Sequence, residues 1–528
     1  MGEDKLGAGF GYPREVTEAV QSASAADDRS LPVAATLLGI GLGVALRIRM
    51  FFTPITADEG GFLAIARAWA NGKVLYRDVW VDRPQGLLVV FRFWDWISGG
   101  SVASVRIMAM IFGALMVVAV ASVTATIAGR RTGAIAAVLV GITSASPAIE
   151  GHIANGELLS GAVAVAGLAV AVRTLARGGR PAMFYASGVI AGLALSIKQS
   201  GYEGLLTVLI WLVPAAIVGW RSWREARRIA LLQLGGMLTV VAMLAAHGAL
   251  TGFHRWWYAF GGYRFSSRSA LKGADWARLR ETARIALPIV GPLVAAGAIG
   301  VFLMVRARRT SPASAPGAAP TTTATIIPAG MQWLMPIWAV VAVIAFATGG
   351  QFHRHYWVTV CPALSALAAI GICRVFSGRS ANWVTAGLMV PALISAVSIL
   401  RLSRDQAPIK ASDDKRLTQE ERLATWFRQN RVAGDQMYLM CAGASFYANA
   451  DEDPPLPYLW FDNVQKVPGA LAALRALFDR PESPRFIALQ QPVSACETST
   501  QFAEQIARNY SEVAVVDGVP VLERSSGT

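Results

Sequence analysis

The side chains in this sequence that could carry chemistry are few and concentrated. Residues 32–407 contain only twelve Asp or Glu residues, whereas residues 408–528 contain sixteen. Two of the twelve, Asp58 and Glu59, are adjacent, and all five histidines fall in the same long apolar part. Carboxylates and imidazoles are the usual groups for proton transfer. Within apolar sequence they are costly, so they usually mark a functional site.

The elements that must position these groups are strongly apolar. The chain of 528 residues is 54% hydrophobic and 16% charged, whereas soluble domains average about 25% charged residues. We therefore expect a polytopic α-helical membrane protein. Eleven apolar runs approach the roughly 20 residues that cross a bilayer: 32–52, 104–127, 133–149, 157–175, 182–198, 203–219, 229–250, 285–305, 329–348, 356–375 and 382–400. The shorter segment 84–99 contains Arg92 and Asp95, which favours a helix at the membrane interface.

Arginine marks every second connection between these runs. Five connections hold fourteen arginines and one acid, Glu225. By the positive-inside rule they are cytoplasmic, as is the tail of residues 1–31. The connections 53–103 and 251–284 and the C-terminal residues 408–528 then lie outside, with eleven of the twelve acids of the apolar part. These clusters account for the net charge of +14, so we expect no nucleic-acid partner.

The first outer connection carries a distinctive order of residues. The acidic pair is followed by Gly72, by Tyr76-Arg77-Asp78 and by Arg83-Pro84. This order resembles the first periplasmic loop of GT-C fold glycosyltransferases that use lipid-linked sugars, of the protein O-mannosyltransferase and aminoarabinose transferase type. Further pieces follow in matching order within residues 50–376: Arg106, Ser146-Pro147, Asn155-Gly156-Glu157, Gly192 to Lys198-Gln199, and Gln351 to Tyr356 before Cys361-Pro362.

The resemblance implies a GT-C transmembrane catalytic domain over residues 32–407 and a role for each acid. Asp58 is implied to be the base that deprotonates the acceptor hydroxyl, with inversion at the anomeric carbon. Glu59 would orient Asp58 or bind the acceptor, and Glu157 would contact the sugar or the acceptor. Acids at the start of a helix also serve as simple N-terminal caps, and that alternative stays open for all three.

The same resemblance implies a set of cations for the donor phosphate. Arginine suits phosphate through its planar fork, and lysine acts as a point charge. The candidates are Arg83, Lys198 and His355, with Arg354 and Arg106 as further candidates. Arg106 and Lys198 could instead anchor span ends at the interface. His353 and His355 could be packing residues or a metal pair, but no third ligand is evident, so we expect no metal and no cofactor.

Two positions depart from the family pattern. This chain has Arg83-Pro84-Gln85 where the family commonly has Lys-Pro-Pro, and Gly61 where an aromatic residue is usual. The arginine keeps the positive charge. The altered neighbours leave the sugar and the acceptor unassigned.

The C-terminal residues 408–528 have an ordinary soluble balance of twelve basic and sixteen acidic residues. Helices are predicted at 417–430, 471–478 and 501–509, and strands at 436–440, 485–489, 513–516 and 519–522. Alternating strands and helices indicate an exported α/β domain. Cys441 and Cys496 could form a disulfide in an oxidising exterior, which the sequence leaves open.

These patterns predict an integral-membrane glycosyltransferase of the cell membrane. It would transfer a sugar from a polyprenyl-phosphate donor to an envelope lipid, polysaccharide or protein outside the membrane. The alternative is a membrane transporter or lipid flippase. That class favours broken helices at mid-membrane and internal repeats, and we find no repeat in this sequence.

Overall fold

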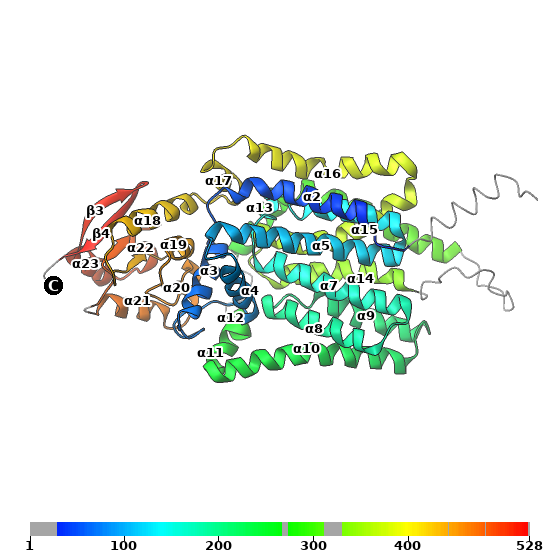
Figure 1. Cartoon of the computed structure of the whole chain (residues 1–528), viewed down its shortest axis with the longest axis horizontal. Coiled ribbons are helices and arrows are strands. Elements are labelled where there is room, and N and C mark those ends of the chain that lie inside the picture. Colours follow the sequence, from blue (N-terminus) through cyan, green and yellow to red (C-terminus); the bar gives the residue numbers. More distant parts are fainter. Residues whose placement is uncertain (1–28, 267–272, 311–329, 442, 481, 526–528) are drawn as a thin grey trace, which may run out of the picture.

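The computed structural model describes residues 29–266, 273–310, 330–441, 443–480 and 482–525. Long helices form an elongated bundle, and a smaller domain built from the C-terminal residues lies at one end of it (Figure 1). The predicted tail 1–31 lies almost wholly outside the described residues.

A helix lies at each of the eleven ranges predicted to cross the membrane. They are α2 (Val33–Phe51), α5 (Val105–Ala128), α6 (Arg130–Thr143), α7 (Gly156–Arg177), α8 (Pro181–Ile197), α9 (Glu203–Ile217), α10 (Trp223–Thr251), α13 (Gly273–Thr310), α14 (Leu334–Thr348), α15 (Cys361–Val375) and α16 (Gly378–Leu400). Among the described residues, seven helices are long and apolar enough to span a membrane, and α8, α9 and α15 are shorter apolar helices. The prediction of a polytopic α-helical membrane protein is confirmed.

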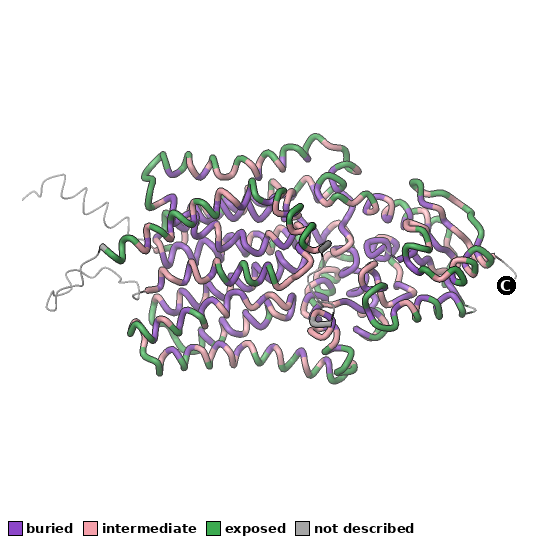
Figure 2. Tube along the Cα trace, turned by 180° about the vertical axis from the view of Figure 1, so that it is seen from behind, coloured by how far each residue is buried: buried purple, intermediate pink, exposed green. Residues whose placement is uncertain are grey.

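Burial divides the bundle into a centre and a periphery (Figure 2). Helices α5 and α7 are largely buried, whereas α10 and α16 lie outside and expose apolar side chains such as Leu231 and Trp383. An apolar surface of this kind suits lipid acyl chains, which are as apolar as leucine.

One predicted span ends earlier than expected. Hydropathy predicted 133–149, but α6 stops at Thr143. The chain then makes a 3-10 turn, η2 (Pro147–Ile149), and reaches Glu150 at a φ of 53°. Proline has no backbone N–H and cannot continue the helical hydrogen bonding. The chain therefore leaves the helical conformation before Glu150. The η2 turn lies at the end of the bundle where the candidate site residues are.

Short helices fill the connections that face the C-terminal domain. The first connection contains α3 (Ala57–Ala70) and α4 (Gln85–Ile97). The segment 84–99 is thus a separate short helix, in agreement with the prediction. The connection after α10 contains α11 (Phe253–Trp257), the π-helix η3 (Tyr258–Gly262) and α12 (Tyr263–Ser266), and η5 (Arg354–Thr359) precedes α15.

The C-terminal domain combines helices with a small mixed sheet. Its elements are α17 (Gln406–Ser412), α18 (Arg416–Asn430), β1 (Met437–Leu439), α19 (Ala444–Ala450), α20 (Phe461–Lys466), α21 (Ala470–Phe478), β2 (Phe486–Ala488), α22 (Val493–Cys496), α23 (Thr500–Asn509), β3 (Tyr510–Val516) and β4 (Val519–Arg524). The strand order is β1-β2-β4-β3, with β1 and β2 parallel and β4 antiparallel to both neighbours. The predicted helices and strands are all present.

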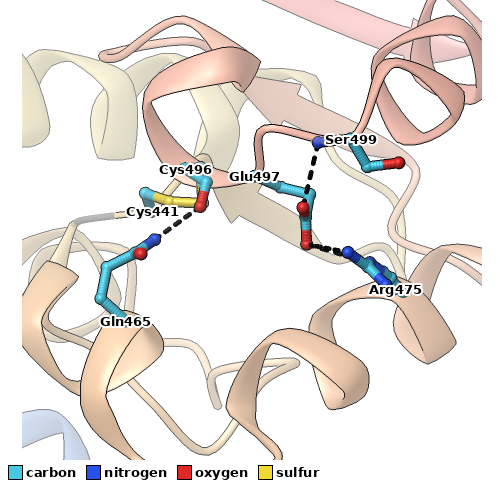
Figure 3. Close-up of a disulfide and its surroundings, with 6 residues drawn as sticks. All are labelled: Cys441, Gln465, Arg475, Cys496, Glu497 and Ser499. Atoms are coloured by element: carbon cyan, nitrogen blue, oxygen red, sulfur yellow. Dashed lines mark hydrogen bonds and ion pairs between the residues drawn. A yellow bond between two sulfur atoms is a disulfide. The ribbon is translucent and has the colours of Figure 1, made fainter.

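A disulfide joins the end of β1 to α22. Cys441 and Cys496 are bonded across 55 residues of sequence, with their Cα atoms 5.4 Å apart (Figure 3). Beside them the Gln465 amide donates to the Cys496 carbonyl, and Arg475 pairs with Glu497 at 2.9 Å. The sequence left this pairing open, and the structure forms it.

The C-terminal domain docks directly on α3. A methyl group at Gly60 would overlap the Ser445 backbone of α19, and one at Gly61 would overlap the Trp460 ring. The Trp80 amide also donates to the Pro457 carbonyl at 3.0 Å. Glycine is needed at both helical positions because only its bare backbone admits this close approach.

Candidate active site

A cavity of about 800 Å³ lies where the helical bundle meets the C-terminal domain. From the bundle side it is lined by residues of α3, of the η2 turn and of η5. From the other side it is lined by 412–417 and 459–463. Of the site residues predicted from the sequence, four line the cavity, namely Asp58, Arg83, Arg354 and His355, and four do not, namely Glu59, Arg106, Glu157 and Lys198.

Asp58 is the carboxylate best placed for chemistry. It lies in the first turn of α3, is half-buried and faces the cavity. Within the described residues it has no hydrogen bond or ion pair. Burial raises the pKa of Asp58, and the positive charges of His355 and Arg83 partly oppose that rise. An unpaired carboxylate with increased proton affinity is suited to general-base work.

Glu59 does not share that position, and the helix-capping role that the sequence left open is the one that the structure forms. Its side chain is fully buried and does not line the cavity. It completes a capping box with Thr56 and pairs with Arg106 at 2.8 Å. It also accepts a hydrogen bond from the Ala154 amide at 2.9 Å. Glu59 is therefore a positioning residue that fastens the start of α3 to the loop before α7.

Arg106 is the partner of Glu59. It is buried, pairs with Glu59 and donates to the Pro54 carbonyl at 3.2 Å. It does not line the cavity. The guanidinium therefore helps to anchor the start of α3.

His355 connects two carboxylates beside Asp58. Its Nδ1 lies 2.7 Å from Glu150, and its Nε2 lies 3.7 Å from Glu157. Burial alone would lower the pKa of His355, but the charges of Glu157 and Glu150 outweigh it, so the pKa is raised. Glu157 also pairs with Lys198, whose ammonium lies 4.4 Å from the centre of the Tyr356 ring. The structure thus brings Glu157, Lys198 and His355 together as one cluster.

Arg83 forms a second charged group on the cavity wall. Its guanidinium lies 2.7 Å from Asp82, which also pairs with Arg264 at 2.7 Å. Burial alone would raise the pKa of Asp82, but the two arginines hold it below its ordinary value. Arg83 is buried and lines the cavity.

Arg354 lies at the other side of the cavity. It donates to the Ala411 carbonyl at 3.2 Å and lies within 4.0 Å of Glu281 and 3.9 Å of Asp413. It therefore belongs to the wall near the C-terminal domain, and the structure does not place it in the cluster of Glu157 and Lys198.

Glu150 is a site residue that sequence reasoning missed. The sequence placed it among the outer acids without a role, yet it lines the cavity and binds His355. Its backbone at a φ of 53° is uncommon for a residue other than glycine, and such conformations cluster at functional sites. The Ser146-Pro147 pair just before it was the available signal.

Arg47, inside the first span, holds the turn that carries Glu150. It is 3% exposed and donates from Nε to the Gly151 carbonyl at 2.9 Å and from Nη2 to the Ser144 carbonyl at 3.0 Å. A buried guanidinium at membrane depth is costly unless it is hydrogen-bonded. We assign it the positioning of this turn.

The described residues contain no group of three or more His, Cys, Asp or Glu side chains arranged to hold a metal ion. His353 stacks on His355 with ring centroids 5.5 Å apart. Burial lowers the pKa of His353 well below its ordinary value, and the charge of His355 adds to that effect.

The helical bundle, the acid-bearing first connection and the α/β domain together form the GT-C fold of polytopic membrane proteins. Solved structures share it over nearly the whole chain. ArnT, an aminoarabinose transferase from Cupriavidus metallidurans bound to undecaprenyl phosphate, superposes with a TM-score of 0.62 at 16% identity, covering 94% of this chain and 98% of that one. The archaeal oligosaccharyltransferase AglB from Archaeoglobus fulgidus, in complex with an inhibitory peptide and a dolichol-phosphate, gives 0.58 at 12% identity, covering 91% and 72%. No protein-family model and no curated protein matches the sequence.

Proposed function

We propose that this chain is a membrane glycosyltransferase that transfers a sugar from a polyprenyl-phosphate donor to a hydroxyl group of a cell-envelope acceptor. The observation that carries this proposal is Asp58, an unpaired carboxylate in the cavity at the end of a membrane bundle, which shares that cavity with Arg83 and His355. That combination supplies a base and a site for a departing phosphate.

The reaction balances with these residues alone. Asp58 accepts the proton of the acceptor hydroxyl as the acceptor oxygen bonds to the anomeric carbon from the side opposite the phosphate. The bond between that carbon and the phosphate oxygen breaks, its electron pair leaves with polyprenyl phosphate, and the configuration inverts. Arg83, Lys198 and His355 neutralise the phosphate. Glu157 contacts the sugar or the acceptor next to that group.

The donor class follows from the fold and from where the cavity lies. ArnT has been solved with undecaprenyl phosphate and AglB with a dolichol-phosphate. A polyprenyl tail stays among lipid acyl chains, so its phosphate reaches a cavity at the end of the bundle. The transporter alternative finds no support among these neighbours.

The proposal places the cavity and the C-terminal domain outside the membrane and the N-terminus in the cytoplasm. The arginine clusters support this orientation through the positive-inside rule. The disulfide between Cys441 and Cys496 supports it too, because disulfides persist in oxidising compartments.

Transfer is proposed to need neither metal nor cofactor, because Arg83 and His355 line the cavity and Lys198 lies in the cluster next to His355. The rate in membranes is then unchanged by EDTA. The sugar is a hexose or a pentose, with mannose and arabinose as the first donors to try.

The test compares wild type with Asp58→Asn in membranes, using radiolabelled polyprenyl-phosphate sugars. We expect label in envelope material with wild type and a loss of about 10²–10⁴-fold with the variant. Asp78→Asn is the matched control, because Asp78 lies in the same connection but pairs with the exposed Arg77. Full transfer by a folded Asp58→Asn protein contradicts the base assignment. If no donor is used by folded wild type, lipid translocation is the next measurement.

A further inference from the structure

Trp460 brings the C-terminal domain into the cavity that contains Asp58. It lines the cavity together with its neighbours Leu459 and Phe461. Its ring packs against Phe62 with centroids 5.6 Å apart. Phe62 also lines the cavity and lies one helical turn after Asp58 on the same face of α3.

The surface of α3 leaves space for the Trp460 indole. A side chain at Gly61 would begin inside the Trp460 ring, so glycine there leaves the room that the indole takes. The indole N–H has no hydrogen-bond partner within the described residues, so packing alone holds the ring. The ring is half-buried and forms part of the cavity wall.

The wall around Trp460 carries both signs of charge. Its acids, taken from the cavity lining near the C-terminal domain, are Glu281, Asp413, Asp414, Glu420 and Asp462, and its bases are Arg278, Arg354, Lys415 and Arg416. A phosphate-bearing acceptor would face the carboxylates, and a cationic acceptor would face the arginines and the lysine. A neutral polyol suits this wall, because each hydroxyl both donates and accepts hydrogen bonds.

We propose that Trp460 is the platform on which a sugar ring of the acceptor stacks, so that the acceptor is a saccharide held between α3 and the C-terminal domain. The stacked ring directs one hydroxyl along the α3 face towards Asp58. This inference rests on the proposed function and names its acceptor class. The cavity of about 800 Å³ lies within the range of ligand pockets.

The experiment uses the full-length protein in lipid nanodiscs with the polyprenyl-phosphate sugar that the membrane assay selects as donor. Acceptors are octyl glycosides of mannose, glucose, galactose and arabinose, a hydroxyl-bearing peptide and a lipid phosphate. The variants are Trp460→Leu, which fills space without an aromatic face, and Trp460→Phe, which keeps one. Trp96→Ala is the control for losing an indole, because Trp96 is 75% exposed at the end of α4.

We expect transfer to octyl glycosides and an increase of about fivefold in the acceptor KM for Trp460→Leu, since an aromatic contact is worth about 1 kcal/mol. Trp460→Phe restores most of the affinity, and the donor KM stays unchanged in both. Equal effects of Leu and Phe, or a matching rise in the donor KM, would show that Trp460 only packs the domains. Transfer to the peptide or the lipid phosphate alone also overturns the saccharide assignment. Asp58→Asn runs in parallel, so a failure of the proposed function is recognised separately by its retained transfer.

Discussion

Glu420 is a buried carboxyl group whose charge opposes folding. It lies in α18, is 2% exposed, and accepts hydrogen bonds from the Ser445 amide at 2.9 Å, the Ser445 hydroxyl at 2.5 Å and the Phe446 amide at 3.1 Å. These contacts hold the start of α19, the helix that packs on α3. Burial raises the pKa of Glu420 from 4.5 to about 7, although the Ser445 contacts and Arg416 oppose the rise.

The size and sign of the effect follow from that shift. A pKa raised from 4.5 to about 7 is a difference of about 2.5 units, or about 3.4 kcal/mol at 1.36 kcal/mol per unit. The unfolded chain loses the proton first as pH rises, so stability is full below pH 4.5 and is lost progressively up to pH 7. The loss is roughly 1 kcal/mol at pH 5 and roughly 3 kcal/mol at pH 8.

Glu420→Gln keeps an oxygen acceptor for the α19 amides and removes the charge. We expect the variant to exceed wild type in opening free energy at α19 by roughly 3 kcal/mol at pH 8 and by roughly 1 kcal/mol at pH 5. Amide hydrogen exchange of residues 444–450, corrected for intrinsic rates, measures that energy locally. The control is Glu421→Gln, where the lost pair with Arg404 changes stability by about 1 kcal/mol or less. A difference between Glu420→Gln and wild type that is constant from pH 5 to pH 8 refutes the reasoning.

Three further predictions concern the site and its supports. Glu150→Gln removes a negative charge that raises the pKa of His355. His355 of the variant therefore loses its proton at lower pH, and the alkaline limb of the rate–pH profile for sugar transfer moves to lower pH. Arg47→Met frees the turn that carries Glu150 and is expected to lower kcat by about 10–100-fold. It also shifts the alkaline limb of the rate–pH profile to lower pH and leaves the donor KM unchanged. An alkaline limb that does not shift would contradict the positioning role of Arg47. Replacing Cys441 and Cys496 by serine opens a 55-residue loop and destabilises the C-terminal domain by about 4 kcal/mol. The rate of proteolytic cleavage within residues 408–525 measures this loss of stability. An unchanged cleavage rate would contradict a stabilising role of the disulfide.

The positions of the membrane helices could be predicted from hydropathy, because hydropathy is a local property of the sequence. Each of the eleven apolar runs became a helix, since a bilayer demands that backbone groups be satisfied within one segment. The early end of α6 shows the limit of that method. Apolar residues continue to Ile149, but Pro147 ends the hydrogen bonding, and averaged hydropathy does not register one proline.

The cavity could not be derived from the sequence in the same way. Its walls come from α3, from η5 and from residues 412–417 and 459–463, which are spread over the sequence from residue 57 to residue 463. The resemblance brought Asp58, Glu157 and His355 together in role, and the structure brings them together in space. The placement of Trp460 against Gly61 required the docked C-terminal domain.

The two residues of the acidic pair differ in which of the alternatives left open by the sequence applies to them. Successive residues of a helix point about 100° apart, and here Asp58 faces the cavity whereas Glu59 is buried away from it. The spacing from Thr56 to Glu59 is the S/T-x-x-E capping box, which commits the second acid to the helix start. Once Glu59 is committed, a buried cation must balance it, and Arg106 does so at 2.8 Å. Only Asp58 of the pair then faces the cavity, so the pattern that looked like a catalytic pair is one carboxylate at the cavity and one anchor.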